Sequence, residues 1–190
     1  MTRILLTVIS CLLVNMSAIA GELPTSDREL AETRLMAEWV GNPEQQFILG
    51  KVYYEGAVVP QDYTEAVKWF RLAADQGSAE SQHMLGVMYD HGDGMPQDFS
   101  KAISWYREAA DQGFAPAQYD LGSQYATGDG VPQNFSEAYV WFSLAASTGH
   151  EMARNDRDVM AGKLSDEKIV QAQQRAAQLF ENIQQGKKEE

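Results

Sequence analysis

The sequence contains a single cysteine, Cys11, among its 190 residues. One thiol cannot form a disulfide within the chain, and it supplies too few ligands for a thiolate metal site. We therefore expect a fold held together by side-chain packing alone, with no metal and no cofactor.

Basic residues are also scarce, since 15 Lys and Arg stand against 27 Asp and Glu, for a net charge of −12. Nucleic acids and anionic membrane surfaces reward clustered Lys and Arg, so we expect neither as a partner. The acidic excess keeps a protein soluble, and it could complement a basic partner.

Long apolar segments are absent except at the start, where residues 4–14 form one apolar run behind Arg3. Ala18-Ile19-Ala20 then supplies the small residues that a signal peptidase accepts. The run is too short to span a membrane. We predict a signal peptide over residues 1–20, cleaved after Ala20, a periplasmic or secreted protein, and no membrane insertion after cleavage.

A second kind of processing stays open, because Val8-Ile9-Ser10-Cys11 loosely fits a lipoprotein cleavage box. Cleavage there would leave a short apolar segment upstream and would strand Leu12-Leu13-Val14 at the new end. The signal-peptidase site after Ala20 is therefore favoured.

The sequence does contain a unit that recurs every 36 residues, over 43–78, 79–114 and 115–150. Units of this length cannot bury their apolar faces alone and must stack on their neighbours, which predicts a solenoid. The recurring residues are Leu49-Gly50, Leu85-Gly86 and Leu121-Gly122, then Tyr53, Tyr89 and Tyr125, Pro60, Pro96 and Pro132, Trp69, Trp105 and Trp141, and the closing Gly77, Gly113 and Gly149.

Each unit has the pattern of two antiparallel helices, and no strand pattern occurs. The Leu, Gly and Tyr of the first half fall on one helical stripe. Glycine in that stripe costs helix propensity, so we expect a partner helix to approach it closely. Loops such as Gly92-Asp93-Gly94 end the first helix, and Asp62, Asp98 or Asn134 caps the second.

Over residues 43–150 this pattern resembles the Sel-one-like repeat. The resemblance implies an all-α, right-handed α/α superhelical solenoid of the tetratricopeptide-like kind, with three full repeats and helical caps. It also implies protein–protein interaction and no shared catalytic residues. The first repeat departs from the pattern, having Ala57-Val58 in place of Asp-Gly, so its loop is expected to turn differently.

The flanking segments are predicted to cap the solenoid. Residues 21–42 form an N-terminal capping helix that Ser26 opens and Gly41 closes. Residues 151–185 form C-terminal capping helices, and residues 186–190 form a charged tail. The last helix begins at Ser165 and seals the open face with Ile169, Ala172, Ala176, Leu179 and Phe180.

Related solenoids line their concave side with the first helix of each unit, and positions 2, 5, 9, 12 and 13 lie opposite its packing stripe. Aromatic residues there are informative, because they waste apolar area unless a partner covers them. The alternative is that they pack against loops or caps. The candidate partner-binding residues are Phe47, Lys51, Tyr54, Glu80, His83, Val87, Asp90, His91, Tyr119 and Ser123. By contrast, Gln46, Gln82 and Gln118 recur on the packing face and are interpreted as structural.

Catalytic and metal chemistry receive little support from the sequence. Glu80, His83, Asp90 and His91 share one helix, but Glu80 and Asp90 are about 15 Å apart along it, too far for one coordination shell. No phosphate-binding or dinucleotide-binding loop is present. His150 is expected to meet the carbonyls that end the preceding helix.

We therefore predict a protein without catalytic residues, an exported adaptor that binds a protein or peptide partner of the cell envelope on its concave face. An envelope hydrolase or glycan-binding protein that uses the same groove is the alternative. The sequence names neither the partner nor the oligomeric state.

Overall fold

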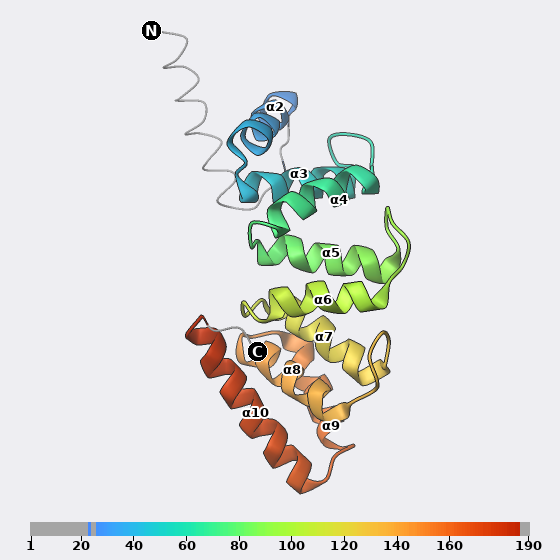
Figure 1. The fold of residues 1–190 in the computed structure, drawn as a ribbon, viewed down its shortest axis with the longest axis vertical. Coiled ribbons are helices and arrows are strands. Elements are labelled where there is room, and N and C mark those ends of the chain that lie inside the picture. Colours follow the sequence, from blue (N-terminus) through green and yellow to red (C-terminus); the bar gives the residue numbers. More distant parts are fainter. Residues whose placement is uncertain (1–22, 24–25, 187–190) are drawn as a thin grey trace. The chain divides into compact units, whose positions relative to one another are not determined.

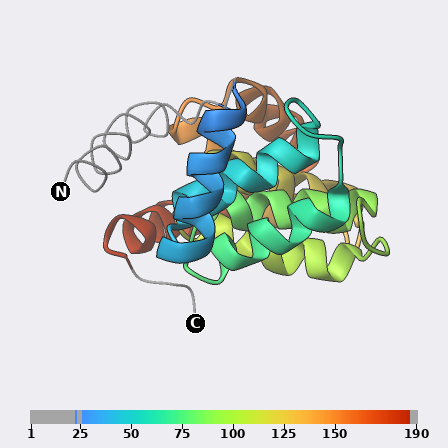
Figure 2. The same cartoon turned by 90° about the horizontal axis from the view of Figure 1, so that it is seen from above.

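A computed structural model describes Leu23 and residues 26–186 of the chain. The predicted signal peptide, Cys11 and residues 187–190 of the charged tail lie outside the described residues. The described part is helical and contains no strand (Figures 1 and 2). None of its helices has the length and apolar character needed to cross a membrane.

The chain divides into two compact units, which are described separately. Unit 1 extends to Ser81 and also contains Asp93–Met95, whereas unit 2 contains Gln82–Gly92 and the chain from Pro96 onward. The elements of unit 1 are α2 (Asp27–Leu35), the π-helical turn η1 (Met36–Val40), α3 (Pro43–Glu55), α4 (Tyr63–Ala74) and the first turn of α5 (Ala79–His91).

Unit 2 holds the rest of α5 and five further helices. These are α6 (Phe99–Ala110), α7 (Ala115–Thr127), α8 (Phe135–Ser147), α9 (Glu151–Ala161) and α10 (Asp166–Gln184). In both units the two helices of a repeat run antiparallel, as α3 and α4 or α7 and α8 do (Figure 1).

The predicted caps set the start of the second helix in each repeat. Asp62 Oδ1 accepts from the Glu65 backbone N–H at 3.0 Å, and Asp98 Oδ1 accepts from that of Lys101 at 3.0 Å. Asn134 Oδ1 accepts two such bonds, at 3.0 and 3.2 Å. Each side chain satisfies amide groups that the first helical turn leaves without a partner.

An aromatic ring explains the glycine in each packing stripe. A Cβ placed on Gly50, Gly86 or Gly122 would lie 2.6, 2.5 or 2.7 Å from a ring carbon of Phe70, Tyr106 or Phe142, respectively. These rings belong to the second helix of the same repeat. The predicted close approach is therefore confirmed in all three repeats, and only glycine leaves room for it.

The first inter-helix loop differs from the other two, as predicted. Gly94 and Gly130 have φ values of +71° and +72°, whereas no described residue other than glycine has a positive φ. Val58, at the equivalent place, instead packs with Val59 against a buried cluster of Leu30, Ala37, Leu49 and Val52. The valine thus contributes to the packing of the first repeat on the N-terminal capping segment.

The recurrent glutamines are structural, as predicted. Gln46 Nε2 donates to the Ala37 carbonyl at 3.2 Å, and Gln118 Nε2 donates to the Ala110 carbonyl at 3.1 Å. Two of the three also accept a bond from a glutamine 30 residues later. Gln76 Nε2 donates to Gln46 Oε1 at 2.7 Å, and Gln112 Nε2 donates to Gln82 Oε1 at 2.6 Å.

The N-terminal segment forms the expected helix. Ser26 Oγ accepts from the Glu29 backbone N–H at 3.3 Å, and Gly41 ends the segment with φ +69°. Its last turn is π-helical rather than α-helical, over Met36–Val40.

The C-terminal helices also begin where predicted, and Ser165 caps α10. Ala172, Ala176 and Leu179 are buried and Ile169 is half-buried, whereas Phe180 is 41% exposed. Phe180 is therefore at the margin of the sealing face, where it lines a pocket together with Leu144 of α8.

His150 meets a carbonyl near the end of α8 as predicted, but through its backbone N–H, which donates to the Ala145 carbonyl at 3.1 Å. Its side chain serves the next helix instead: Nδ1 accepts from the backbone N–H of Ala153 at 3.3 Å and caps the start of α9. The ring also stacks on Tyr119, with centroids 4.4 Å apart. The glycine before it turns the chain, and the histidine begins the next helix.

Candidate protein-binding surface

Within each first helix, the candidate residues lie opposite the Leu-Gly-Tyr packing stripe, and this set of positions is called the A-helix face. Phe47, Lys51, Tyr54 and Glu80 belong to unit 1, and His83, Val87, Asp90, His91, Tyr119 and Ser123 belong to unit 2. Glu80 and His91 are exposed, and the others are half-buried.

The fifth residue of each repeat packs on the same ring that covers the glycine. The ring centroids of Phe47 and Phe70 are 5.9 Å apart, and those of His83 and Tyr106 are 5.7 Å apart. Tyr119 lies 5.4 Å from Phe142. These rings are therefore anchored within their own repeat, and each remains half-buried.

Lys51 and Tyr54 lie beside this aromatic contact, and Glu80 lies in the first turn of α5. Lys51 Nζ lies 5.9 Å from the centre of the Phe47 ring and 3.9 Å from Glu55 Oε1. Tyr54 packs 5.2 Å from Tyr63, and burial, followed by the nearby charge of Asp93, raises the pKa of its hydroxyl. Glu80 accepts a hydrogen bond from Ser78 at 3.2 Å.

In unit 2 carboxylates join the first helices of successive repeats. His83 Nε2 of α5 lies 2.7 Å from Asp120 Oδ2 of α7. The Tyr119 hydroxyl of α7 donates to Asp156 Oδ2 of α9 at 2.8 Å. The two bonds have the same form, from the fifth residue of one repeat to the sixth residue of the next, and they align α5, α7 and α9.

Sequence reasoning missed Asp120 and Asp156. They stand 36 residues apart, so the repeat period placed them in equivalent positions. The first two repeats carry Ile48 and Met84 at that position, which hid the pattern.

Asp90 makes a second link between α5 and α7, accepting from Gln124 Nε2 at 3.0 Å. Burial raises the pKa of the Asp90 carboxyl, and the Gln124 hydrogen bond offsets part of that rise. Burial also raises the pKa of the Tyr119 hydroxyl, and its bond to Asp156 adds to the effect. The ionised form of the Asp90 carboxyl is therefore disfavoured on this face, because burial removes part of its hydration.

Two predicted members contribute less to the surface. The Ser123 hydroxyl donates to the Tyr119 carbonyl at 3.1 Å, within its own helix. Val87 is half-buried. Neither offers a free polar group to a partner.

The A-helix face continues onto α9, which sequence reasoning treated only as a cap. Met152 and Val159 are 58% and 55% exposed. They occupy the second and ninth positions of a fourth unit, 36 residues after Pro116 and Ser123. The repeat period identifies them once α9 is recognised as a further first helix.

Metal-binding geometry is not found among the described residues, where no three His, Cys, Asp or Glu side chains are grouped to hold an ion. The pair His83 and Asp120 has no third ligand.

A family model for the Sel1 repeat matches residues 43–78, 79–114 and 115–150. The fold is similar to a protective antigen present in uropathogenic Escherichia coli strains that displays an SLR fold, with a TM-score of 0.76 and 30% identity. That match covers 83% of this chain and 33% of the other, so the chain spans about a third of the length of that protein.

A Sel1 repeat protein from Oxalobacter formigenes is also similar, with a TM-score of 0.63 and 37% identity over 69% of this chain and 98% of the other. No curated protein matches the chain. The predicted all-α solenoid class is thus confirmed by the repeats and by both structures.

Proposed function

The chain belongs to the Sel1 repeat family, and from this premise we propose that it is an exported adaptor that holds a segment of a protein partner on its A-helix face. Proteins of this family generally mediate protein–protein interactions and are typically non-catalytic. The proposal adds the surface, the cellular location and the character of the partner.

The exposed apolar side chains of α9 are the observation that carries the proposal. Met152 and Val159 are two helical turns apart on one side of α9, and each exposes more than half of its surface. Large apolar side chains grouped on a face mark interaction sites more often than isolated ones do. Asp156 lies between them in sequence and bonds to Tyr119 of the neighbouring helix.

The charge of the same surface favours a basic partner. Asp90, Asp120 and Asp156 lie along α5, α7 and α9, and each carboxylate accepts a bond from a neighbouring helix. A carboxylate retains further acceptor sites after one such bond. Together with the acidic excess of the chain, this supports a partner segment that carries Lys or Arg beside apolar residues.

Site-specific photo-crosslinking in cells tests the surface. A photoreactive amino acid at Asn155, between Met152 and Val159, is expected to capture a partner, and the same amino acid at Gln174 on exposed α10 is the control. Capture at Asn155 should fall in a Met152→Ser, Val159→Ser double variant and persist in Val170→Ser. Equal capture by all three proteins would reject the A-helix face.

Export rests on residues 1–20 and has its own test. The N-terminal sequence of the protein recovered from the envelope fraction is expected to begin at Gly21. A mature chain that begins at Cys11, or one that retains Met1 in the cytoplasm, would refute cleavage after Ala20.

A further inference from the structure

A hydrogen bond that joins neighbouring helices in the first two repeats is missing from the third. Gln46 Oε1 and Gln82 Oε1 each accept from the side-chain amide of a glutamine, at 2.7 and 2.6 Å. In the third repeat the equivalent donor position is Thr148. Its hydroxyl is turned away, because it donates to the Ala145 carbonyl of its own helix at 2.9 Å.

The missing bond leaves a buried acceptor without a partner. Gln118 is 2% exposed, and its Oε1 has no hydrogen-bond partner. The bond from Gln118 Nε2 to the Ala110 carbonyl fixes the amide, so the oxygen cannot exchange places with the nitrogen without losing that bond. A buried polar atom in this state is costly until a donor reaches it.

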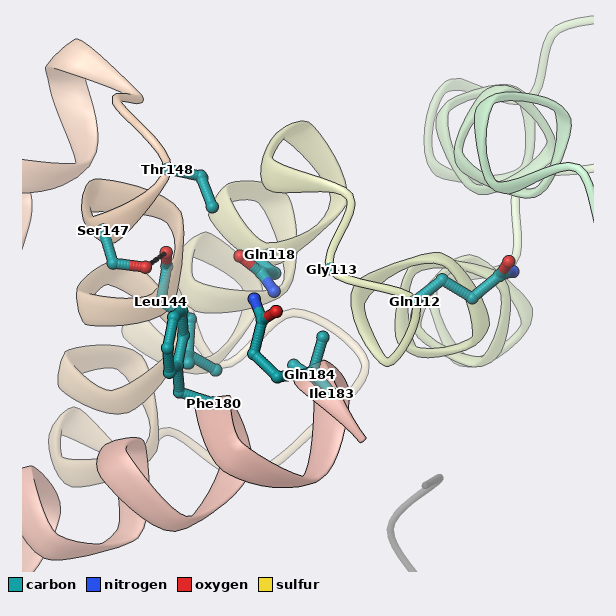
Figure 3. Close-up of a pocket in the computed structure, with 9 residues that line it drawn as sticks. All are labelled: Gln112, Gly113, Gln118, Leu144, Ser147, Thr148, Phe180, Ile183 and Gln184. Carbon is teal, nitrogen blue, oxygen red and sulfur yellow. Dashed lines mark hydrogen bonds between the residues drawn. The ribbon is translucent and has the colours of Figure 1, made fainter. Parts of the chain in front are cut away.

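The same amide lines a pocket at the end of α8 (Figure 3). The pocket has a volume of about 240 Å³, and Leu144, Phe180 and Ile183 supply its apolar walls. Helix α10 forms one side of the pocket through Ile183, and Gly113 lies close to this side chain. A Cβ placed on Gly113 would lie 3.1 Å from Ile183 Cγ2. A site of this size is smaller than pockets for drug-sized ligands, roughly 300–1,000 Å³, and suits one side chain.

We propose that this pocket is a second interaction site, which receives the side-chain amide of a glutamine or asparagine from a partner protein. The first two repeats show the chemistry that the acceptor takes, because each fills the equivalent place with a primary amide on a short apolar stem. In the third repeat the buried acceptor belongs to a residue that lines a pocket, and this pocket has apolar walls for such a stem. The inference is independent of the A-helix face.

The chain contains one competitor for the site. Gln184 of α10 lines the same pocket, and Figure 3 shows it on the wall that faces Gln118. Its side chain is exposed and forms no bond with Gln118 Oε1, which has no partner. The experiment therefore has to separate a partner's amide from Gln184.

Propionamide serves as the probe in an NMR titration of the full chain, followed through the Gln118 side-chain amide and the Gly113 backbone amide. Propionamide is expected to shift both signals saturably. N,N-dimethylpropionamide has the same stem but no N–H donor. Its dissociation constant is therefore expected to be at least about fivefold higher than that of propionamide. Equal responses to the two compounds, or no saturable response, would overturn the proposal.

Variants assign the effect to the pocket. Thr148→Gln rebuilds the internal glutamine of the other repeats and is expected to abolish the propionamide response, whereas Thr148→Val removes only the hydroxyl and should keep it. Gln118→Met removes the acceptor and provides a second loss variant. Gln184→Ala is expected to leave the affinity within about twofold; binding that appears only in Gln184→Ala would show that the chain fills its own site and would overturn the proposal.

Discussion

The carboxyl group of Asp90 is half-buried beside Gln124, and burial raises its pKa above the ordinary value. A raised pKa in the folded state means that the ionised form is less favourable there than in the unfolded chain. The contribution of Asp90 to stability is thus fully present below the unfolded pKa, about 3.9, and is lost as the pH rises through the folded pKa.

Asp90→Asn is expected to raise the free energy of unfolding at pH 7 and to leave it nearly unchanged at pH 3. The asparagine keeps an oxygen that can accept from Gln124 and removes the desolvated charge. Urea unfolding at the two pH values measures the difference. A gain of the same size at both would mean that packing, and not ionisation, is responsible.

Gly86 has no side chain, and this absence makes room for the Tyr106 ring. In an ordinary helix, Gly→Ala stabilises by roughly 1 kcal/mol. Here the new methyl group would lie 2.5 Å from the Tyr106 ring, and overpacking of a core costs about 1–3 kcal/mol. Gly86→Ala is therefore expected to destabilise the protein by about 1 kcal/mol or more in thermal unfolding.

A double-mutant cycle identifies the ring as the cause. In a Tyr106→Leu background the penalty of Gly86→Ala should shrink or reverse, because the colliding ring atoms are gone. A penalty that is unchanged in that background would point to the helix backbone instead.

At the scale of elements, the inter-helix loops separate two reasons for glycine. Gly130 has φ +72°, and a Cβ on it would lie 2.6 Å from the Phe99 Cβ. Gly149 has φ +93°, but no atom lies within 4 Å of the same position. An added side chain would meet backbone strain alone at Gly149, but both backbone strain and a steric collision at Gly130.

Gly149→Ala is expected to lose about 1–2 kcal/mol, the cost of a left-handed backbone. Gly130→Ala should lose more, because the loop must also move away from α6. Chemical denaturation of the two variants gives the comparison. Equal losses of unfolding free energy would show that the loop moves away from Phe99 without a measurable energetic penalty.

The elements themselves could be predicted because the framework repeats. The glycine stripe, the Asp and Asn caps and the recurrent glutamines each appear three times, and one physical reason accounts for each set. The bonds of His83 with Asp120 and of Tyr119 with Asp156 join residues of different repeats, which a pattern within one repeat does not reveal. The capping role of the His150 side chain was missed because a histidine seldom serves as an N-cap.

At the scale of the whole molecule, α10 closes the end of the repeat array. Ala172, Ala176 and Leu179 are buried, and Gln173 donates to the Tyr139 hydroxyl of α8 at 3.2 Å. Arg175 Nε of α10 lies 3.0 Å from Glu137 Oε1 of α8. The array therefore ends in a helix that covers α8.

Leu179→Ala is expected to lower the free energy of unfolding by about 2–4 kcal/mol, as for other buried leucines. Val170→Ala, at an exposed position of the same helix, should change it by less than about 0.5 kcal/mol. Urea unfolding of both variants is the measurement. Similar small losses would mean that α10 contributes little to the stability of the chain.

The contacts of Gly94 with Tyr63 and of Gly130 with Phe99 have a consequence for how such a protein lengthens. In each case a loop glycine fits against the beginning of the second helix in the preceding repeat, so an internal copy carries both halves of the junction. Duplication of one 36-residue segment of the gene would reproduce matching edges on both sides. Gene duplication can then lengthen the binding surface, because each added repeat brings the residues that form its contacts with both neighbours.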